Sequence, residues 1–340
     1  MVPGTLGNAD LGWEKTASWN GGFESAWLGN RIFLDVDMYY SQTTDQIFER
    51  NIPVMTGFTR MYSSMGQIDN KGIEVNLRTV NIDKQDFNWT TTMIFWMNRN
   101  KLVHLYGEDL DGDGKEDDDI ANSRFIGKPL GAIYGYVQDG IVQETDTEYM
   151  QRYSVPAGVP KYKDIDNNGT INADDRKILG YSTHNFKLNM SNMLSYKNLD
   201  LYFMLTGTFG GGGFFLRDNA TAYMTNGSGL FNSNSVYIPW WTPENKSNVY
   251  PSATFTGDGG RFLGLQSRAF VRLQDVTLSY TFKEPWVKNL NISNLKAFLT
   301  AKNLFTVTKW EGDDPEVGSR VRASDNPVLT TYSLGLLISF

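Results

Sequence analysis

The last ten residues of the chain, 331–340, read TYSLGLLISF. If this stretch is a β-strand, alternate residues face opposite sides. One face then carries only apolar or aromatic residues, namely Tyr332, Leu334, Leu336, Ile338 and Phe340. The other face carries serine and glycine, with Leu337 as the exception. This pattern is typical of the final strand of an outer-membrane β-barrel, whose outer face contacts lipid. A buried last strand of a β-sandwich would look similar, so these residues alone leave both folds open.

Composition excludes several classes of function. The chain has 340 residues, no cysteine and a net charge of −7. The absence of cysteine excludes disulfides, thiolate metal sites and a cysteine nucleophile, and the acidic balance argues against nucleic acid as a partner. The two histidines, His104 and His184, are far apart and have no ligand-like neighbours. Because no paired carboxylates, Ser/His/Asp arrangement or phosphate-binding glycine loop stands out, we do not expect an enzyme.

The start of the chain lacks targeting features. Met1 is followed by Val-Pro-Gly-Thr, with neither the basic nor the apolar segment of a secretory signal. No run approaches the roughly 20 apolar residues that a membrane helix needs. Since a membrane barrel reaches the outer membrane only with a signal, this start predicts a piece of a longer protein.

Nine segments are predicted to be strands, mostly because apolar and polar residues alternate in them. These segments are 13–27, 31–41, 73–78, 87–98, 186–196, 199–209, 271–282, 295–307 and 331–340. In the seventh segment the alternation changes phase, which predicts a β-bulge near Gln274. The eighth alternates poorly and is assigned mainly by its position. A further hairpin is predicted around 133–142, within a long connection.

The connections between these segments are alternately short and long. The long ones are 42–67, 101–183, 210–268 and 308–329. A sandwich has no reason to alternate in this way, whereas an outer-membrane barrel has short periplasmic turns and long extracellular loops. The alternation therefore favours a transmembrane antiparallel β-barrel. Nine is an odd and small number of strands for such a barrel, and the first strand would expose an unpaired edge to lipid. We therefore expect the carboxy-terminal part of a larger barrel.

Several motifs, in this order along the chain, resemble those of the SusC/RagA family of TonB-linked outer-membrane transporters. They are LGWEKT at 11–16, DNKGIE at 69–74, IGKPLG at 126–131, YGY at 134–136, DGI at 139–141, YKD at 162–164, WTPEN at 241–245, FVRL at 270–273, NLFT at 303–306 and DPEVG at 314–318. Each motif alone is weak, but their order across nearly the whole chain is specific.

The resemblance implies a barrel of about 22 strands, of which residues 1–340 would supply the carboxy-terminal nine or ten. The plug domain and the amino-terminal strands would be absent from this chain. It also implies TonB-dependent import of oligosaccharides, or of oligopeptides, across the outer membrane of a Gram-negative, Bacteroidetes-like cell. The implied partners are a SusD-like surface lipoprotein, the TonB system acting through the missing plug, and the lipid bilayer. Two alternatives remain open: a soluble or surface all-β glycan-binding protein, and a non-functional truncated barrel.

Residues 164–175, DIDNNGTINADD, have the spacing of a twelve-residue calcium loop. Oxygen ligands would come from Asp164, Asp166, Asn168, the carbonyl of Thr170, Asn172 and Asp175. The last position carries aspartate in place of glutamate, which shortens its reach. A metal-free loop built from Asx-turns is the alternative. The stretch 109–114 begins in the same way, but Ile120 stands at its twelfth position, so we interpret it as a solvated acidic loop.

Aromatic residues cluster in the predicted long loops. They are Tyr134, Tyr136, Tyr237, Trp240, Trp241 and Trp310. Flat aromatic faces stack on sugar rings or on peptide side chains, so these residues are candidates for a substrate-binding site. The alternative, favoured for any single one of them, is that they pack loop against loop or form an interfacial girdle.

Overall fold

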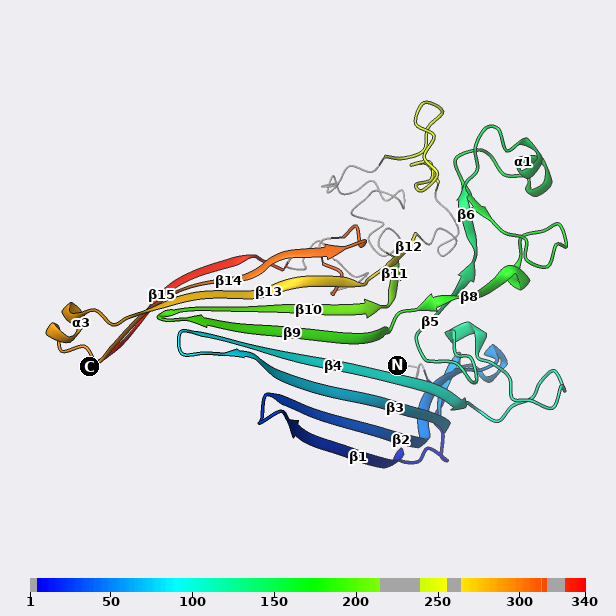
Figure 1. The fold of residues 1–340 in the computed structure, drawn as a ribbon. Helices are drawn as coiled ribbons and strands as arrows, with labels where there is room; N and C mark the ends of the chain where they lie inside the picture. The colour runs from blue at the N-terminus through cyan, green and yellow to red at the C-terminus, as the bar shows by residue number, and fades with distance from the viewer. Residues whose placement is uncertain (1–4, 215–238, 256–263, 313, 317–327) are drawn as a thin grey trace.

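The computed structural model describes residues 5–214, 239–255, 264–312, 314–316 and 328–340. Its main feature is one nine-stranded antiparallel sheet, drawn in Figure 1 as an extended wall. In order across the sheet, the strands are β1 (Lys15–Trp27), β2 (Ile32–Asn51), β3 (Arg60–Asp83), β4 (Phe87–His104), β9 (His184–Tyr196), β10 (Leu199–Gly210), β13 (Phe270–Phe282), β14 (Asn294–Thr308) and β15 (Thr331–Ser339). β1 and β15 form the two edges of the sheet. The predicted all-β antiparallel architecture, with nine strands in chain order, is confirmed.

One face of this sheet is apolar and exposed. Trp19 in β1 keeps 77% of its surface exposed. The register carries the apolar face from strand to strand, because Val36, Val75, Phe95 and Leu188 lie in one row across β2, β3, β4 and β9. The residues between them in sequence, such as Asp37, point to the opposite, polar face. A continuous apolar surface of this kind is the pattern of a barrel wall that faces lipid on one side and a polar interior on the other.

The β-bulge predicted near Gln274 is present. The ladder between β10 and β13 shifts register between Leu273 and Asp275, which leaves Gln274 as the extra residue. The ladder between β13 and β14 shifts at the same place, but there β14 carries the extra residue, because Asn303 and Leu304 stand opposite Gln274. The bulge returns Val271 and Leu273 to the apolar face that Val276 and Leu278 share, and this explains why the sequence alternation changes phase there.

Two of the sequence predictions are wrong, one of a long connection and one of a hairpin. The long connection expected at 42–67 is mostly strand, because β2 continues to Asn51, β3 begins at Arg60, and only a short segment with the 3₁₀ helix η1 (Val54–Thr56) joins them. The expected hairpin at 133–142 does not form either. Instead β5 (Ala132–Tyr136) pairs with β8 (Arg176–Tyr181), and β6 (Gln138–Ile141) pairs with β7 (Pro160–Tyr162). The two segments expected to pair with each other, β5 and β6, instead follow one another on the same side of a two-stranded arm. The strands that pair with them, β8 and β7, come about 20 to 40 residues later in the chain.

The long excursions leave the sheet at one end, and the short turns lie at the other (Figure 1). The β4–β9 excursion contains η2 (Ile120–Asn122), α1 (Thr147–Tyr153) and η3 (Ala173–Asp175), besides the two strand pairs above. The β10–β13 excursion contains the paired strands β11 (Gly212–Phe214) and β12 (Leu265–Ser267). The short helix α3 (Pro285–Asn289) lies in the connection between β13 and β14. Among the described residues, no helix has the length and apolarity to cross a membrane.

Candidate functional site

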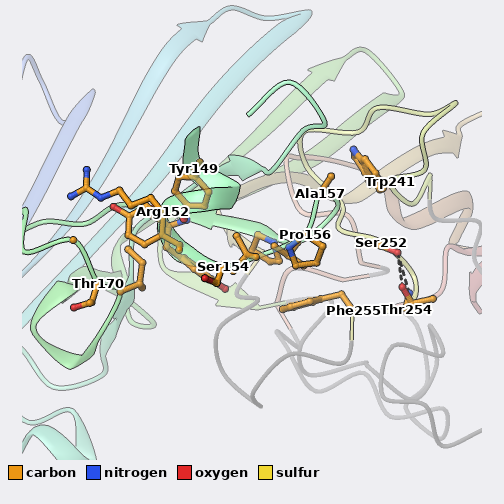
Figure 2. A pocket seen from close by; sticks show the side chains of 17 residues that line it. Tyr149, Arg152, Ser154, Pro156, Ala157, Thr170, Trp241, Ser252, Thr254 and Phe255 are labelled. Carbon is orange, nitrogen blue, oxygen red and sulfur yellow. Dashed lines mark hydrogen bonds between the residues drawn. The ribbon is translucent and has the colours of Figure 1, made fainter. Parts of the chain in front are cut away.

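A large cavity lies among the excursions rather than against the sheet, and Figure 2 shows its lining. It has a volume of about 900 Å³. Its walls come from α1 and the turn after it, from β7, from residues 169–171 and from residues of the β10–β13 excursion. Five aromatic residues line it, namely Tyr149, Tyr153, Tyr162, Trp241 and Phe255. We call it the loop cavity.

The loop cavity exists because residues 240–255 dock onto the arm formed by β6 and β7. The indole N–H of Trp241 donates to Gln143 Oε1 (2.9 Å), and the amide of Ile141 donates to Asn248 Oδ1 (3.0 Å). The amide of Ser252 donates to the carbonyl of Gly158 (2.7 Å). These contacts join segments about 100 residues apart in sequence, so they fix one wall of the cavity against the other.

Gly158 lets the indole of Trp241 approach the backbone. The glycine has a φ of +85°, and a Cβ built there would lie 2.5 Å from Cε3 of the indole. Trp241 itself is only 8% exposed. A residue with a side chain at position 158 would therefore meet both a backbone penalty and a steric clash. The glycine is needed for this close packing.

The predicted calcium loop borders the same cavity, because Gly169, Thr170 and Ile171 form part of its lining. Side-chain oxygens of Asp164, Asp166 and Asp175 lie within 4.8 Å of one another. Asp175 is completely buried. The structure therefore brings together three of the six predicted ligand residues as a compact group of carboxylates.

The hydrogen bonds around these carboxylates leave room for a cation. Asp164 accepts from the amides of Asn168 (3.1 Å) and Gly169 (2.9 Å), while Asp175 accepts from those of Ile165 (2.6 Å) and Asn172 (2.9 Å). Each carboxylate oxygen has two lone pairs, so a single amide contact does not exhaust either oxygen of Asp175, whereas Oδ2 of Asp164 also accepts from Arg152 and Tyr153. An all-oxygen donor set in a tight loop is the chemistry that Ca²⁺ prefers. The residues thus fit this ion.

Two residues of the cavity wall contact the loop directly. The Arg152 guanidinium lies 3.2 Å from Oδ2 of Asp164, and the Tyr153 hydroxyl donates to the same oxygen at 3.0 Å. Burial alone would raise the pKa of the Asp164 carboxyl, but the Gly169 amide, the Tyr153 hydroxyl and the Arg152 charge outweigh it. The net pKa lies below the ordinary value of 3.8. The carboxylate therefore stays ionised at neutral pH, as cation binding requires.

The second acidic stretch folds in a similar manner. The side chain of Asp109 accepts from the amides of Gly112 (2.7 Å) and Gly114 (2.9 Å). Asp117 joins Asp109 and Asp111 within 4.8 Å. The sequence interpretation considered the residue at the twelfth position, Ile120, as the last possible ligand. It therefore overlooked the carboxylate of Asp117, three residues earlier.

The six predicted aromatic residues do not form one site in the described parts of the chain. Tyr134 packs against Phe125 with ring centroids 4.9 Å apart, and Tyr136 against Tyr162 at 5.5 Å. The remaining members have separate surroundings: Trp240 meets the ring of Tyr250, Trp310 is 4% exposed, Trp241 lines the loop cavity, and Tyr237 lies outside the described residues. Loop-against-loop packing thus describes most of them.

Sequence reasoning missed the other aromatic residues of the loop cavity. Tyr149 and Tyr153 stand four residues apart, and their rings pack at 4.6 Å on α1. That spacing puts them on one helix face, so a short helix following Asp146 was the available signal. Phe255 carried no comparable signal, because its place depends on how a distant excursion docks.

Comparisons with known proteins agree with this architecture. The profile of a protein family described as "TonB dependent receptor-like, beta-barrel" matches residues 2–304. The chain is 30% identical over 337 residues to TonB-dependent receptor P3 of Formosa agariphila, covering 97% of this chain and 33% of that protein. It is 28% identical over 348 residues to TonB-dependent receptor SusC of Bacteroides thetaiotaomicron, covering 98% of this chain and 32% of the relative.

Among solved structures, the RagAB peptide transporter superimposes with a TM-score of 0.76 at 25% identity. The match covers 98% of this chain and 36% of that one. The chain thus spans about a third of the length of the relatives that it matches.

Proposed function

The chain belongs to the TonB-dependent receptor-like β-barrel family, and we propose that it forms part of the barrel wall and the extracellular loops of an outer-membrane importer of oligosaccharides. Oligopeptides are the other substrate class that this type of transporter suggests, because RagAB is a peptide transporter. The family is one of transporters and not of enzymes.

The observation that carries this proposal is the division of the sheet into two faces. An exposed apolar face runs across the strands, a polar face lies behind it, and long excursions leave at one end only. Only a wall between lipid and a polar passage requires all three features together. In this arrangement residues 1–340 are the carboxy-terminal part of the barrel, and a longer protein supplies the plug and the remaining strands. The coverage of a third of each relative supports the view that these residues are part of a longer protein.

Energy and substrate capture are assigned to partners. The TonB system would act through the plug, and a SusD-like lipoprotein would cover the loop end of the barrel. The names of the matched proteins support both partners, since they include TonB-dependent receptors, SusC and the RagAB pair. The polar face of the sheet would only shape the substrate path.

Uptake by intact cells tests the proposal. Cells that express the full-length transporter should take up fluorescently labelled oligosaccharides, and uptake should stop when the gene is deleted or when TonB is inactivated. A parallel measurement with labelled oligopeptides separates the two substrate classes. Fractionation should recover the protein in the outer membrane, with heat-modifiable migration on a gel. A detergent-free soluble protein, or uptake that persists without TonB, would refute the proposal and favour a glycan-binding protein.

We further propose that the loop 164–175 holds a structural Ca²⁺ ion. The ligands would be the side chains of Asp164, Asp166, Asn168, Asn172 and Asp175 with the carbonyl of Thr170. The ion would join the two halves of the loop, and thereby stiffen the wall that Thr170 and Ile171 give to the loop cavity.

Isothermal titration of the full-length transporter with CaCl₂ tests this site. Asp166→Ala should remove one binding event, because Asp166 is a ligand candidate that no cation of the described chain neutralises. Asp174→Ala is the matched control, since Asp174 is exposed, belongs to the same loop and is not a ligand candidate. If the wild type shows no calcium heat, or if both variants bind as the wild type does, the site is refuted.

A further inference from the structure

A second cavity lies in the wall itself, at the point where β4 and β9 separate. The two strands pair as far as Trp96 opposite Lys187. Beyond that pair the strands diverge, and a cavity of about 390 Å³ opens between them. Its lining includes Trp96, Asn98, Arg99, Asn185 and Lys187. We call it the fork cavity.

By alternation Trp96, Asn98 and Lys187 lie on the polar face of the sheet, whereas Arg99 starts from the other face and reaches into the gap between the strands, where its guanidinium donates to the carbonyl of Asn185. Trp96 and Lys187 alternate in sequence with Phe95 and Leu188, which lie on the apolar face. On that apolar face the ring of Phe186 packs against Phe95 with centroids 5.7 Å apart. Since the apolar face is the lipid-facing one, the fork cavity faces the passage that a substrate would follow.

The charge of the fork cavity is positive and unbalanced. Arg99 and Lys187 line it, and no aspartate or glutamate among the described residues does. Within the described part of the chain neither cation has a carboxylate partner; Arg99 donates to the carbonyl of Asn98 (3.1 Å) and to that of Asn185. Across the sheet Lys187 pairs with Trp96 of β4, and Trp96 pairs with Glu74 of β3, which is the nearest acid in this row of paired residues. Two strand spacings separate Glu74 from Lys187, about 10 Å.

The cavity also contains an unused hydrogen-bond acceptor. Oδ1 of Asn98 is buried and has no hydrogen-bond partner. A buried acceptor without a donor is costly, so the Asn98 side chain gains a hydrogen bond if it turns its amide oxygen toward a ligand in the cavity. A sugar hydroxyl is such a donor, and the indole of Trp96 offers the aromatic surface on which the apolar side of a pyranose packs.

From these features we propose that the fork cavity binds an anionic sugar unit, a pyranose that carries a carboxylate or a sulfate. The anionic group would meet Lys187 and Arg99, a hydroxyl would donate to Asn98, and the ring would lie against Trp96. The proposal rests on the proposed function, because it specifies the class of oligosaccharide that passes this point of the wall. A charged group held in a partly enclosed site is a stronger selector than hydroxyls alone.

Three hexasaccharide probes and one peptide probe test the assignment on the purified full-length transporter. The carboxylated probe is hexagalacturonate, the neutral one is its methyl ester with the same backbone, and the sulfated one is a carrageenan hexamer. A hexapeptide of alternating glutamate and alanine represents an acidic peptide. We expect at least one acidic sugar to bind more tightly than the methyl ester. Lys187→Gln should weaken that binding about tenfold, the effect of one charged hydrogen bond.

Controls separate the site from a general effect of charge. Lys177→Gln removes the same charge from an exposed lysine of β8 that does not line the fork cavity, and it should leave binding unchanged. Lys187→Arg keeps the charge and should retain binding. The proposal is overturned if both glutamine variants behave alike, if neither acidic sugar binds more tightly than the ester, or if only the peptide responds to Lys187→Gln. None of these outcomes would exclude TonB-dependent uptake of neutral substrates, so the proposed import function is tested separately.

Discussion

Replacing Gly158 by alanine tests whether close packing under Trp241 holds the loop cavity together. The glycine has a φ of +85°, where a residue with a Cβ pays about 1–2 kcal/mol. The new methyl group would lie 2.5 Å from the indole of Trp241, and such overpacking costs about 1–3 kcal/mol more. The expected loss is therefore about 2–5 kcal/mol, all of it between residues 240–255 and the β6–β7 arm.

This loss is comparable with the stability of the docked segment. Trp241 to Gln143, Gln143 to the Ser247 carbonyl, Ile141 to Asn248 and Ser252 to Gly158 give hydrogen bonds across the junction. At about 0.5–1.5 kcal/mol each, with about 2–3 kcal/mol for burying the indole, they supply about 4–9 kcal/mol. Gly158→Ala should thus leave the sheet folded and free the segment part of the time.

Hydrogen exchange of the full-length transporter, followed by mass spectrometry, measures this opening. Peptides from 241–255 should exchange about 30-fold to a few thousand-fold faster, because each 1.4 kcal/mol is a factor of ten. Gly57→Ala is the control, since Gly57 has a similar φ of +81° but open space around it. It should affect only the β2–β3 connection. Exchange of 241–255 at the wild-type rate in Gly158→Ala would refute the packing argument.

Three further predictions concern other parts of the chain. Arg272→Met removes the ion-pair partner that lies 2.8 Å from the buried Asp314. Hydrogen exchange of residues 309–316 should therefore become faster by an amount equivalent to about 3–5 kcal/mol. Arg78→Met is the control, because Arg78 lies outside any ion pair of the described residues, and it should leave the exchange of residues 309–316 unchanged. Deleting Gln274 removes the β-bulge but leaves Leu273 and Val276 on the same face, because only Asp275 then separates them. The deletion variant should therefore keep the heat-modifiable migration of the full-length barrel, and loss of that migration would contradict this. Because the pKa of Asp164 is lowered on folding, its stabilising contribution is present above the ordinary value of 3.8 and is lost as pH falls through the folded pKa. Exchange protection of its loop should therefore be constant from about pH 8 to 5 and fall only in stronger acid, and loss of protection already near pH 6 would show that another group controls the loop.

Where lipid and a polar interior lie on opposite sides of the sheet, strands could be predicted from sequence. The alternation around Val276 located β13, and its change of phase located the bulge at Gln274. The upper part of β2, at 42–51, has no such contrast, because strands that extend beyond the bilayer are not faced by lipid. The sequence there is polar and resembles that of a loop, although its backbone pairs with β3 along most of its length.

The same reasoning explains which sites were predictable. The carboxylate group at Asp164, Asp166 and Asp175 was found because its members lie within twelve residues, so spacing alone sets their geometry. The walls of the loop cavity come from α1, β7 and an excursion some 100 residues later. They are joined by single side chains such as Gln143 and Asn248, whose partners no local pattern specifies. Both cavities therefore depend on how distant segments meet, the fork cavity on where two strands separate and the loop cavity on a glycine that admits one indole. In this fold, sites that form within one loop can be found from spacing, whereas sites between loops or strands emerge only from the folded arrangement.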